Sequence, residues 1–441
     1  MARRLVITLV VLLLASIALL AAVSWRVAIA PADPPPPASF DPALVARGAN
    51  LAALGNCVSC HTAADGKPYA GGYPMHTPFG TIYGTNITPD PETGIGRWSL
   101  EAFVRAMREG VDREGRHLYP AFPYTHFNLM SDDDLGALYA YMMTREPVRA
   151  ERPQNDVPFP LDIRMLLAGW KLLFLEQKAP RTIAAASAGE NRGAYLVQGV
   201  AHCGACHTPR NVLGAEKKDE YLFGGEAEGW HAPALDARSP APVPWTADAL
   251  YRYLRYGASE THAAAAGPMA PVVTNLAVAS EQDVRAISAY IASVMGAPDE
   301  ARQRRADRAL ARARGASGAE SPPEGDAQAG ALLHDSTCAV CHNRAERPPG
   351  SPSGEALHLA LSTALALDEP GNLMRIVLQG RAPPDGERGP HMPGFHAALT
   401  DEQIASLVNY LRAAYTDRPA WRAAARDVRR ARTSIAEITE P

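Results

Sequence analysis

The six cysteines of this chain all belong to three copies of one pentapeptide. The copies are Cys57-Val-Ser-Cys60-His61, Cys203-Gly-Ala-Cys206-His207 and Cys338-Ala-Val-Cys341-His342. In this pattern two thiols can form thioethers to the vinyl groups of a haem, and the histidine that follows can donate one axial nitrogen to the iron. The sequence therefore predicts three covalently bound c-type haems.

Other uses of a Cys-x-x-Cys pair fit this chain less well. A zinc site would need a second cysteine pair or two histidines at finger spacing, and a thioredoxin-type redox pair is rarely followed by histidine three times over. Because the pattern uses every cysteine, none remains for a four-cysteine iron-sulfur cluster or a structural disulfide.

Two methionines are candidates for the sixth iron ligand. A methionine thioether favours ferrous iron and raises its reduction potential. Met269 follows Gly267-Pro268 and Met392 precedes Pro393, so both stand beside prolines in extended loops rather than on helix faces. We predict that they complete the second and third iron sites.

The first copy differs, because Phe122 stands where the repeat leads us to expect methionine. Met130 is favoured as the sixth ligand there, since it would preserve the thioether chemistry. His126 is the alternative and would give a bis-histidine haem. Met75 is a more remote option, and an open five-coordinate iron also remains.

The chain also carries a threefold repeat around these motifs. A glycine stands three residues before a leucine upstream of each motif, and a tyrosine lies ten residues after an N-cap residue downstream of it. The glycines are Gly48, Gly193 and Gly330, the caps are Ser131, Ser280 and Thr400, and the tyrosines are Tyr141, Tyr290 and Tyr410. Such glycines allow close helix crossing.

This arrangement resembles the small class I cytochrome c fold, so we expect an all-α protein with three tandem domains of that kind and an N-terminal transmembrane helix. The expected segments are an anchor or signal at 1–30, a proline-rich spacer at 31–39, cytochrome c domains at 40–148, 187–298 and 324–416, linkers at 149–186 and 299–323, and a basic helix at 417–441.

The N-terminus predicts membrane attachment. Arg3 and Arg4 precede an apolar run over residues 5–23, which is long enough to cross a bilayer with the N-terminus inside. The alternative is a signal peptide cleaved after Ala28-Ile-Ala30. Either way we expect the rest of the chain on the periplasmic side of a bacterial inner membrane. The proline-rich spacer would hold the first domain roughly 20 Å from that membrane.

The linkers have unusual compositions. Residues 159–175 are apolar but interrupted by charges, which favours a helix packed between domains, with a surface for a partner subunit or the membrane interface as the alternative. Residues 301–315 and 421–432 are rich in alanine and arginine and are expected to form solvated helices; a contact with anionic lipid or an acidic partner is the other interpretation. The net charge of -4 gives no indication of nucleic-acid binding.

Residues 77–96 and 115–124 resemble the membrane-anchored triheme cytochrome c subunits of bacterial periplasmic dehydrogenases, and the resemblance extends over about 40–415. It implies that the chain accepts electrons from a quinoprotein, flavoprotein or molybdenum hydroxylase subunit and passes them to ubiquinone or another cytochrome. Many alcohol and gluconate members have methionine where this chain has Phe122, which favours the molybdenum hydroxylase branch.

The residues offer no phosphate-binding glycine loop, zinc site or nucleophile-base pair. We therefore expect a non-catalytic electron-transfer subunit of an oxidoreductase complex. The alternatives are a haem peroxidase, which an open first iron would favour, and a terminal-oxidase subunit or soluble shuttle.

Overall fold

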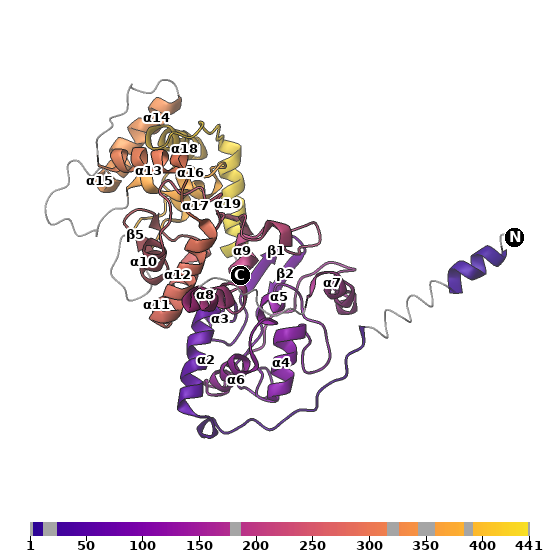
Figure 1. Cartoon of the computed structure of the whole chain (residues 1–441). Helices are drawn as coiled ribbons and strands as arrows, with labels where there is room; N and C mark the ends of the chain where they lie inside the picture. Colours follow the sequence, from indigo (N-terminus) through magenta and orange to yellow (C-terminus); the bar gives the residue numbers. More distant parts are fainter. Residues whose placement is uncertain are drawn as a thin grey trace. The chain divides into compact units, whose positions relative to one another are not determined.

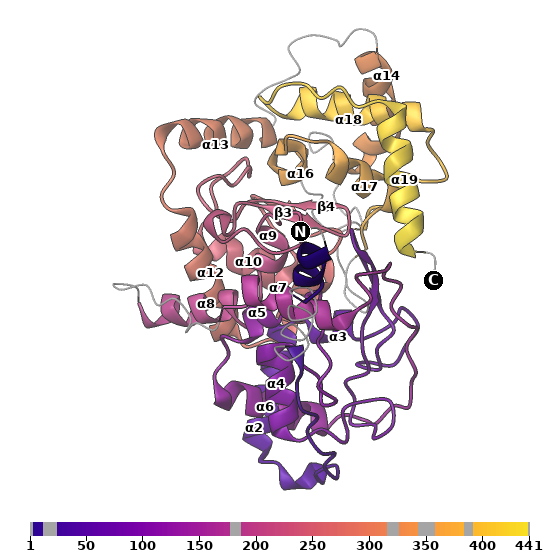
Figure 2. The same cartoon turned by 90° about the vertical axis from the view of Figure 1, so that its right-hand side faces the viewer.

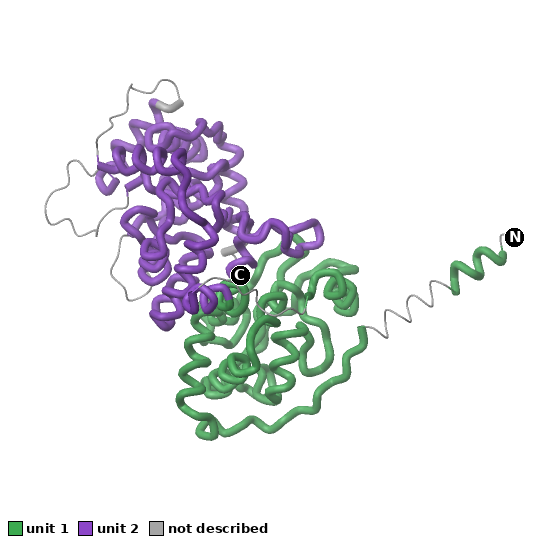
Figure 3. The backbone as a smooth tube through the Cα atoms, in the orientation of Figure 1, with its two compact units in different colours: residues 1–181, 195–202 green, residues 182–194, 203–441 purple. Residues whose placement is uncertain are grey.

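The computed structural model describes residues 3–11, 24–176, 187–314, 326–342, 358–382 and 391–439. The chain forms two compact units (Figure 3). One consists of residues 1–181 with 195–202, and the other of residues 182–194 with 203–441. The first unit contains the first Cys-x-x-Cys-His motif, and the second unit contains the other two.

The repeated helix pairs predicted from the sequence are present (Figure 1). The pairs are α2 (Pro42–Leu54) with α6 (Asp132–Met143), α8 (Ala188–Gln198) with α12 (Glu281–Met295), and α14 (Asp326–Leu333) with α18 (Asp401–Tyr415). The described residues also form the α-helices α3 (Cys57–Cys60), α4 (Leu100–Glu109), α5 (Tyr124–Phe127), α7 (Leu167–Phe174), α9 (Gly204–His207), α10 (Ala247–Tyr256), α11 (Met269–Val278), α13 (Glu300–Ala313), α15 (Ala339–His342), α16 (Thr363–Ala366), α17 (Gly371–Gln379) and α19 (Ala425–Thr439).

The glycine of each repeat lies where the two helices cross. A Cβ placed on Gly48 would overlap the carbonyl oxygen of Ala137 and lie 2.6 Å from the Cβ of Tyr141. In the same way, a Cβ placed on Gly193 would lie 2.7 Å from the Cβ of Tyr290, and one placed on Gly330 would lie 2.7 Å from the Cβ of Tyr410. The close helix crossing expected at these glycines is therefore confirmed, because only a residue without a side chain lets the two backbones approach so closely.

The predicted N-caps are also confirmed. The hydroxyls of Ser131, Ser280 and Thr400 each accept a hydrogen bond from the backbone N–H three residues later, at 3.2, 3.4 and 3.2 Å. Thr400 also has a reciprocal capping box, in which the Gln403 side chain accepts a hydrogen bond from the N–H of Thr400. These caps fix where the second helix of each pair begins.

Three two-stranded antiparallel sheets within the described ranges modify the expected all-α fold. They pair β1 (Pro74–Thr77) with β2 (Gly80–Tyr83), β3 (Gly225–Ala227) with β4 (Trp230–Ala232), and β5 (Ala258–Ser259) with β6 (Ala263–Ala264). The first two hairpins turn at glycines with positive φ, Gly80 at 114° and Gly229 at 73°. Strands this short contain too few residues to show the alternation of apolar and polar side chains from which a strand is predicted. The fold is still mostly helical.

The two basic helices are not wholly solvated, which corrects the expectation for them. In α13, Ala306 and Ala309 are buried, and two arginines pair with Asp417. In α19, Val428 is fully buried where the helix packs on α17 and α18 (Figure 2). Each helix therefore has one face in the core of the second unit and one in solvent.

The segment around the proline-rich stretch lies against the first domain. The N–H of Ile29 donates to the carbonyl of Arg113 at 2.9 Å, and the N–H of Ala32 donates to that of Arg97 at 3.0 Å. Residues 29–32 are therefore bound to the first domain and do not form a free extended spacer. Backbone hydrogen bonds of this kind leave no recognisable pattern in a sequence.

The predicted membrane anchor lies largely outside the described residues, which omit 12–23. Among the helices that are described, none combines the length and the apolar character needed to cross a bilayer.

Candidate functional site

The first two motifs hold their histidines in the same way. His61 follows α3 directly, and its Nδ1 lies 2.6 Å from the carbonyl oxygen of Thr85. His207 ends α9, and its Nδ1 lies 2.7 Å from the carbonyl oxygen of Pro233. Because a carbonyl oxygen only accepts, each Nδ1 must carry the proton, which leaves the lone pair of the ring on Nε2. This is the tautomer that can coordinate a metal through Nε2, and such a bond is the usual support of a ligating histidine.

Burial tunes the side chains of these motifs for that role. It lowers the pKa of His61 and of His207, although the backbone hydrogen bond of each opposes the shift, so both rings are kept in the neutral form that binds iron. Burial raises the pKa of Cys57 and of Cys203 to about 12, with the neighbouring cysteine adding to the effect. These raised pKa values contrast with those of the acidic thiols in catalytic redox pairs.

Two glycines that the sequence did not single out hold a strand against each motif. A Cβ on Gly84, which follows β2, would overlap the carbonyl oxygen of Cys60, and a Cβ on Gly225, the first residue of β3, would overlap that of Cys206. The two glycines lie at different spacings from their motifs, so no periodic signal could have identified them.

The third motif begins at Cys338, the last residue of a π-helical turn over His334–Cys338, and continues on α15. Cys338 packs against the core of the third repeat, and burial raises the pKa of its thiol. Residues 343–357, which follow the motif, are outside the described part of the chain. The hydrogen bond from the histidine Nδ1 to a backbone carbonyl is therefore described for the first two motifs, at His61 and His207.

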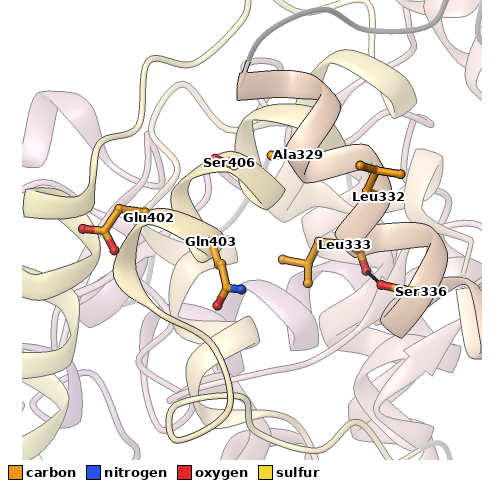
Figure 4. Close-up of a pocket in the computed structure, with 7 residues that line it drawn as sticks. All are labelled: Ala329, Leu332, Leu333, Ser336, Glu402, Gln403 and Ser406. Atoms are coloured by element: carbon orange, nitrogen blue, oxygen red, sulfur yellow. Dashed lines mark hydrogen bonds between the residues drawn. The ribbon is translucent and has the colours of Figure 1, made fainter.

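A pocket of about 430 Å³ lies between α14 and the start of α18 (Figure 4). Its lining residues are Ala329, Leu332, Leu333, Ser336, Glu402, Gln403 and Ser406. None of them belongs to a Cys-x-x-Cys-His motif, so this pocket is separate from the predicted haem-binding residues.

The expectation that both predicted methionine ligands lie in extended loops is confirmed for Met392 and wrong for Met269, which is the first residue of a helix. Met269 begins α11, four residues after Ala265. Met392 exchanges two backbone hydrogen bonds of 2.8 Å with Arg381, and the Nε of Arg381 donates to the carbonyl oxygen of Ala265 at 2.9 Å. Arg381 therefore joins the methionine loop of the third repeat to that of the second, within one compact unit.

The first repeat places Phe122 at the position equivalent to Met269. The N–H of Leu118 donates to the carbonyl of Gly110 at 2.7 Å, and the matching bond in the second repeat, from Ala265 to Gly257, is 2.9 Å long. Phe122 and Met269 each lie four residues beyond the donor of this bond. The Phe122 ring packs against an aromatic neighbour, Phe127, with 5.3 Å between centroids.

Both alternative ligands for the first iron are buried. Met130 is 2% exposed, and its carbonyl accepts from Arg108 at 3.0 Å. His126 is 5% exposed, and its Nδ1 lies 2.7 Å from the carbonyl oxygen of Gln198. The bond of His126 is thus of the same type as that of His61. The third option, Met75, lies on β1 opposite Ile82.

Comparison with known proteins shows what the chain is similar to. Residues 45–146 match the family model described as cytochrome c, and residues 325–411 match the model described as cytochrome C oxidase, cbb3-type, subunit III. The cytochrome c subunit of alcohol dehydrogenase (quinone) from Gluconobacter oxydans is 35% identical over 90% of this chain and 84% of that protein. The gluconate 2-dehydrogenase cytochrome c subunit from Pantoea cypripedii is 39% identical over 88% of this chain and 89% of that protein.

A third relative is considerably longer than this chain. It is a nicotinate dehydrogenase subunit from Pseudomonas putida, and it is 47% identical over 406 residues, which make up 91% of this chain. The chain spans about a third of that relative's length, since the match covers 33% of it.

Proposed function

Because the chain belongs to the cytochrome c subunits of bacterial membrane-bound dehydrogenases, a family of electron-transfer subunits, we propose that it carries three covalent haems and relays electrons from a dehydrogenase catalytic subunit to ubiquinone or a downstream cytochrome. The observation that carries this proposal is the repeated geometry of His61 and His207. Each is a half-buried imidazole that follows a cysteine pair directly and is oriented through Nδ1 by a backbone carbonyl.

In this proposal each haem c supplies a one-electron carrier, and the protein determines where that carrier sits and how readily it is reduced. The cysteine pairs Cys57/Cys60, Cys203/Cys206 and Cys338/Cys341 would hold the haems covalently, and His61, His207 and His342 would each supply a nitrogen ligand. Met269 and Met392 would supply neutral sulfur ligands, which favour the reduced state. Substrate oxidation takes place on a separate subunit.

For the first haem we propose Met130 as the sixth ligand, with His126 as the alternative. Met130→Leu is expected to remove the methionine-to-iron charge-transfer band of one haem, because leucine has no donor atom. His126→Gln should leave that band unchanged. Absorption and magnetic circular dichroism spectra of the oxidised protein measure both variants. The opposite pattern, with only the His126→Gln spectrum altered, would assign the ligand to His126 and lower the expected potential of this haem.

The N-terminal run over residues 5–23 is proposed to anchor the chain in the bacterial inner membrane, with the haem domains on the periplasmic side. The relatives named above as subunits of dehydrogenases support a catalytic partner. One of them is named for nicotinate, an N-heterocyclic acid. Together with Phe122 this favours a partner of the molybdenum hydroxylase type over a quinoprotein or flavoprotein.

The proposal predicts which proteins accompany the chain. Purification from membranes under mild detergent should yield a dehydrogenase catalytic subunit in stoichiometric amount, and addition of its substrate should reduce the haems. Mass spectrometry of the purified complex and haem absorbance measure these two outcomes. Recovery of terminal-oxidase subunits in place of a dehydrogenase would contradict the proposal and support the alternative that the cbb3-type match of residues 325–411 raises.

A further inference from the structure

The segment that connects the N-terminal apolar run to the first unit is held by a buried cluster. The carbonyl oxygen of Ser24 accepts a hydrogen bond from Nε2 of His117 at 2.9 Å. Nδ1 of His117 faces the Nζ of Lys171 at 2.9 Å, and Lys171 also donates to the carbonyl of Gly110 at 2.6 Å. Since Lys171 lies on α7, this cluster fixes α7 beside Ser24, which directly follows the N-terminal run in the sequence. Figure 1 shows where α7 lies in the first unit.

Helix α7 has one buried side and one side exposed to solvent. Lys171 and Ala168 are 8% and 4% exposed and face the first unit. Leu172 and Leu173, the next two residues, are 71% and 68% exposed. Two adjacent leucines this exposed contribute no burial of apolar surface to the folded unit. Helix α7 therefore presents an apolar surface that the described residues do not cover.

Other exposed apolar residues belong to the segments that meet at the same cluster. Trp25 and Val27 adjoin Ser24 in sequence and are 72% and 73% exposed, and Phe159 is 79% exposed. The segment after Phe159 is tied to the same part of the unit, because the hydroxyl of Tyr119 donates to the carbonyl of Leu161 at 3.2 Å. We call Trp25, Val27, Phe159, Leu172 and Leu173 together the apolar face.

The position of this face relative to the N-terminal run indicates what covers it. Only Ser24 separates the run over 5–23 from Trp25, and Ser24 is itself bound to His117. One residue of extended chain spans at most about 3.6 Å, so a bilayer that holds the run lies within a few ångströms of the cluster. Tryptophan is enriched at such interfaces, and an apolar segment too short and too charged to cross a bilayer is suited to lie on it.

We propose that the apolar face rests in the interfacial layer of the lipid bilayer and gives the first haem domain a second, monotopic membrane contact. This inference rests on the membrane anchor proposed above. The contact makes α7 part of the membrane-bound surface and fixes the side of the first domain that faces the lipid.

Photo-crosslinking tests the proposal in the full-length, haem-loaded protein. The protein is reconstituted in nanodiscs of phosphatidylcholine and phosphatidylglycerol that contain a lipid with a diazirine near the glycerol end of its acyl chain, and adducts are mapped by mass spectrometry. We expect lipid adducts on residues 5–23 and, separately, on 24–27 and 159–174. The double variant Leu172→Glu/Leu173→Glu should lose the adducts on 159–174 and keep those on 5–23.

The matched control is Val212→Glu/Val278→Glu, which changes two residues of the second unit that are 91% and 78% exposed. This control should keep every adduct. Adducts confined to residues 5–23 would overturn the proposal and leave the anchor intact, whereas adducts on 159–174 without any on 5–23 would uphold the apolar face and remove the anchor.

Discussion

Cys203→Ala/Cys206→Ala is expected to yield a protein with two haems in place of three. Both thioether bonds of the second motif are lost, and a single axial histidine does not retain a haem through denaturation. Intact-mass measurement should therefore show a deficit of one haem, and the pyridine haemochrome absorbance per polypeptide should fall by a third. Electron transfer from the dehydrogenase to the acceptor should be lost with it if the second haem lies on the route.

Ala205→Ser is the matched control for this variant, because it changes an intervening position of the same motif that contributes no bond to the haem. It should keep the full haem complement. A denatured double-cysteine variant that still carried three haems would contradict the assignment of Cys203 and Cys206 as attachment residues.

Gly48→Ala is expected to lower the free energy of unfolding of the first unit by about 1–3 kcal/mol, the usual cost of overpacking. The added methyl group would overlap the carbonyl oxygen of Ala137, a backbone atom that cannot move away without separating α2 from α6. Denaturant unfolding followed by circular dichroism and haem absorbance measures the change. The separation of the helices should also broaden the spectrum of the first haem.

Gly136→Ala controls for the replacement of a helical glycine. Gly136 lies inside α6 with nothing within 4 Å of a Cβ placed on it, so the variant should gain up to about 1 kcal/mol from the better helix propensity of alanine. If Gly48→Ala proved as stable as Gly136→Ala, the close helix crossing would have no energetic importance. Gly193→Ala should behave as Gly48→Ala does, since its methyl group meets the carbonyl oxygen of Ala286.

The features predicted best from the sequence are those that occur in all three copies of the repeat. Each crossing glycine stands three residues before a leucine, and each N-cap stands ten residues before a tyrosine. Because these spacings recur in all three copies, comparison of the copies identifies the glycines, the caps and the helices that they belong to. A feature that occurs once gives no such comparison. Lys171 is an example: within an apolar run it was interpreted as an interruption, yet it is buried and anchors α7 through Gly110 and His117.

The basic helices show a second reason why the sequence was insufficient. Alanine and arginine composition indicates a helix and a charged face, but it does not show that Ala306 or Val428 meets a partner surface elsewhere in the chain. The same holds for the histidine supports of the motifs, because the acceptors at Thr85 and Pro233 are backbone carbonyls that any residue could supply.

The link that Arg381 makes between two repeats has a consequence for the speed of electron flow. Asn372 strengthens the link, since its side-chain amide donates to and accepts from the backbone of His231 at 2.8 and 2.9 Å. The rate of electron tunnelling between two redox centres falls steeply as their separation grows. Two centres on domains that move freely would therefore exchange electrons only when the domains come close together. In the relay proposed above, the contact of Arg381 with Ala265 would keep the second and third haems at a separation set by the fold, so that the electron hop between them would not wait for diffusion.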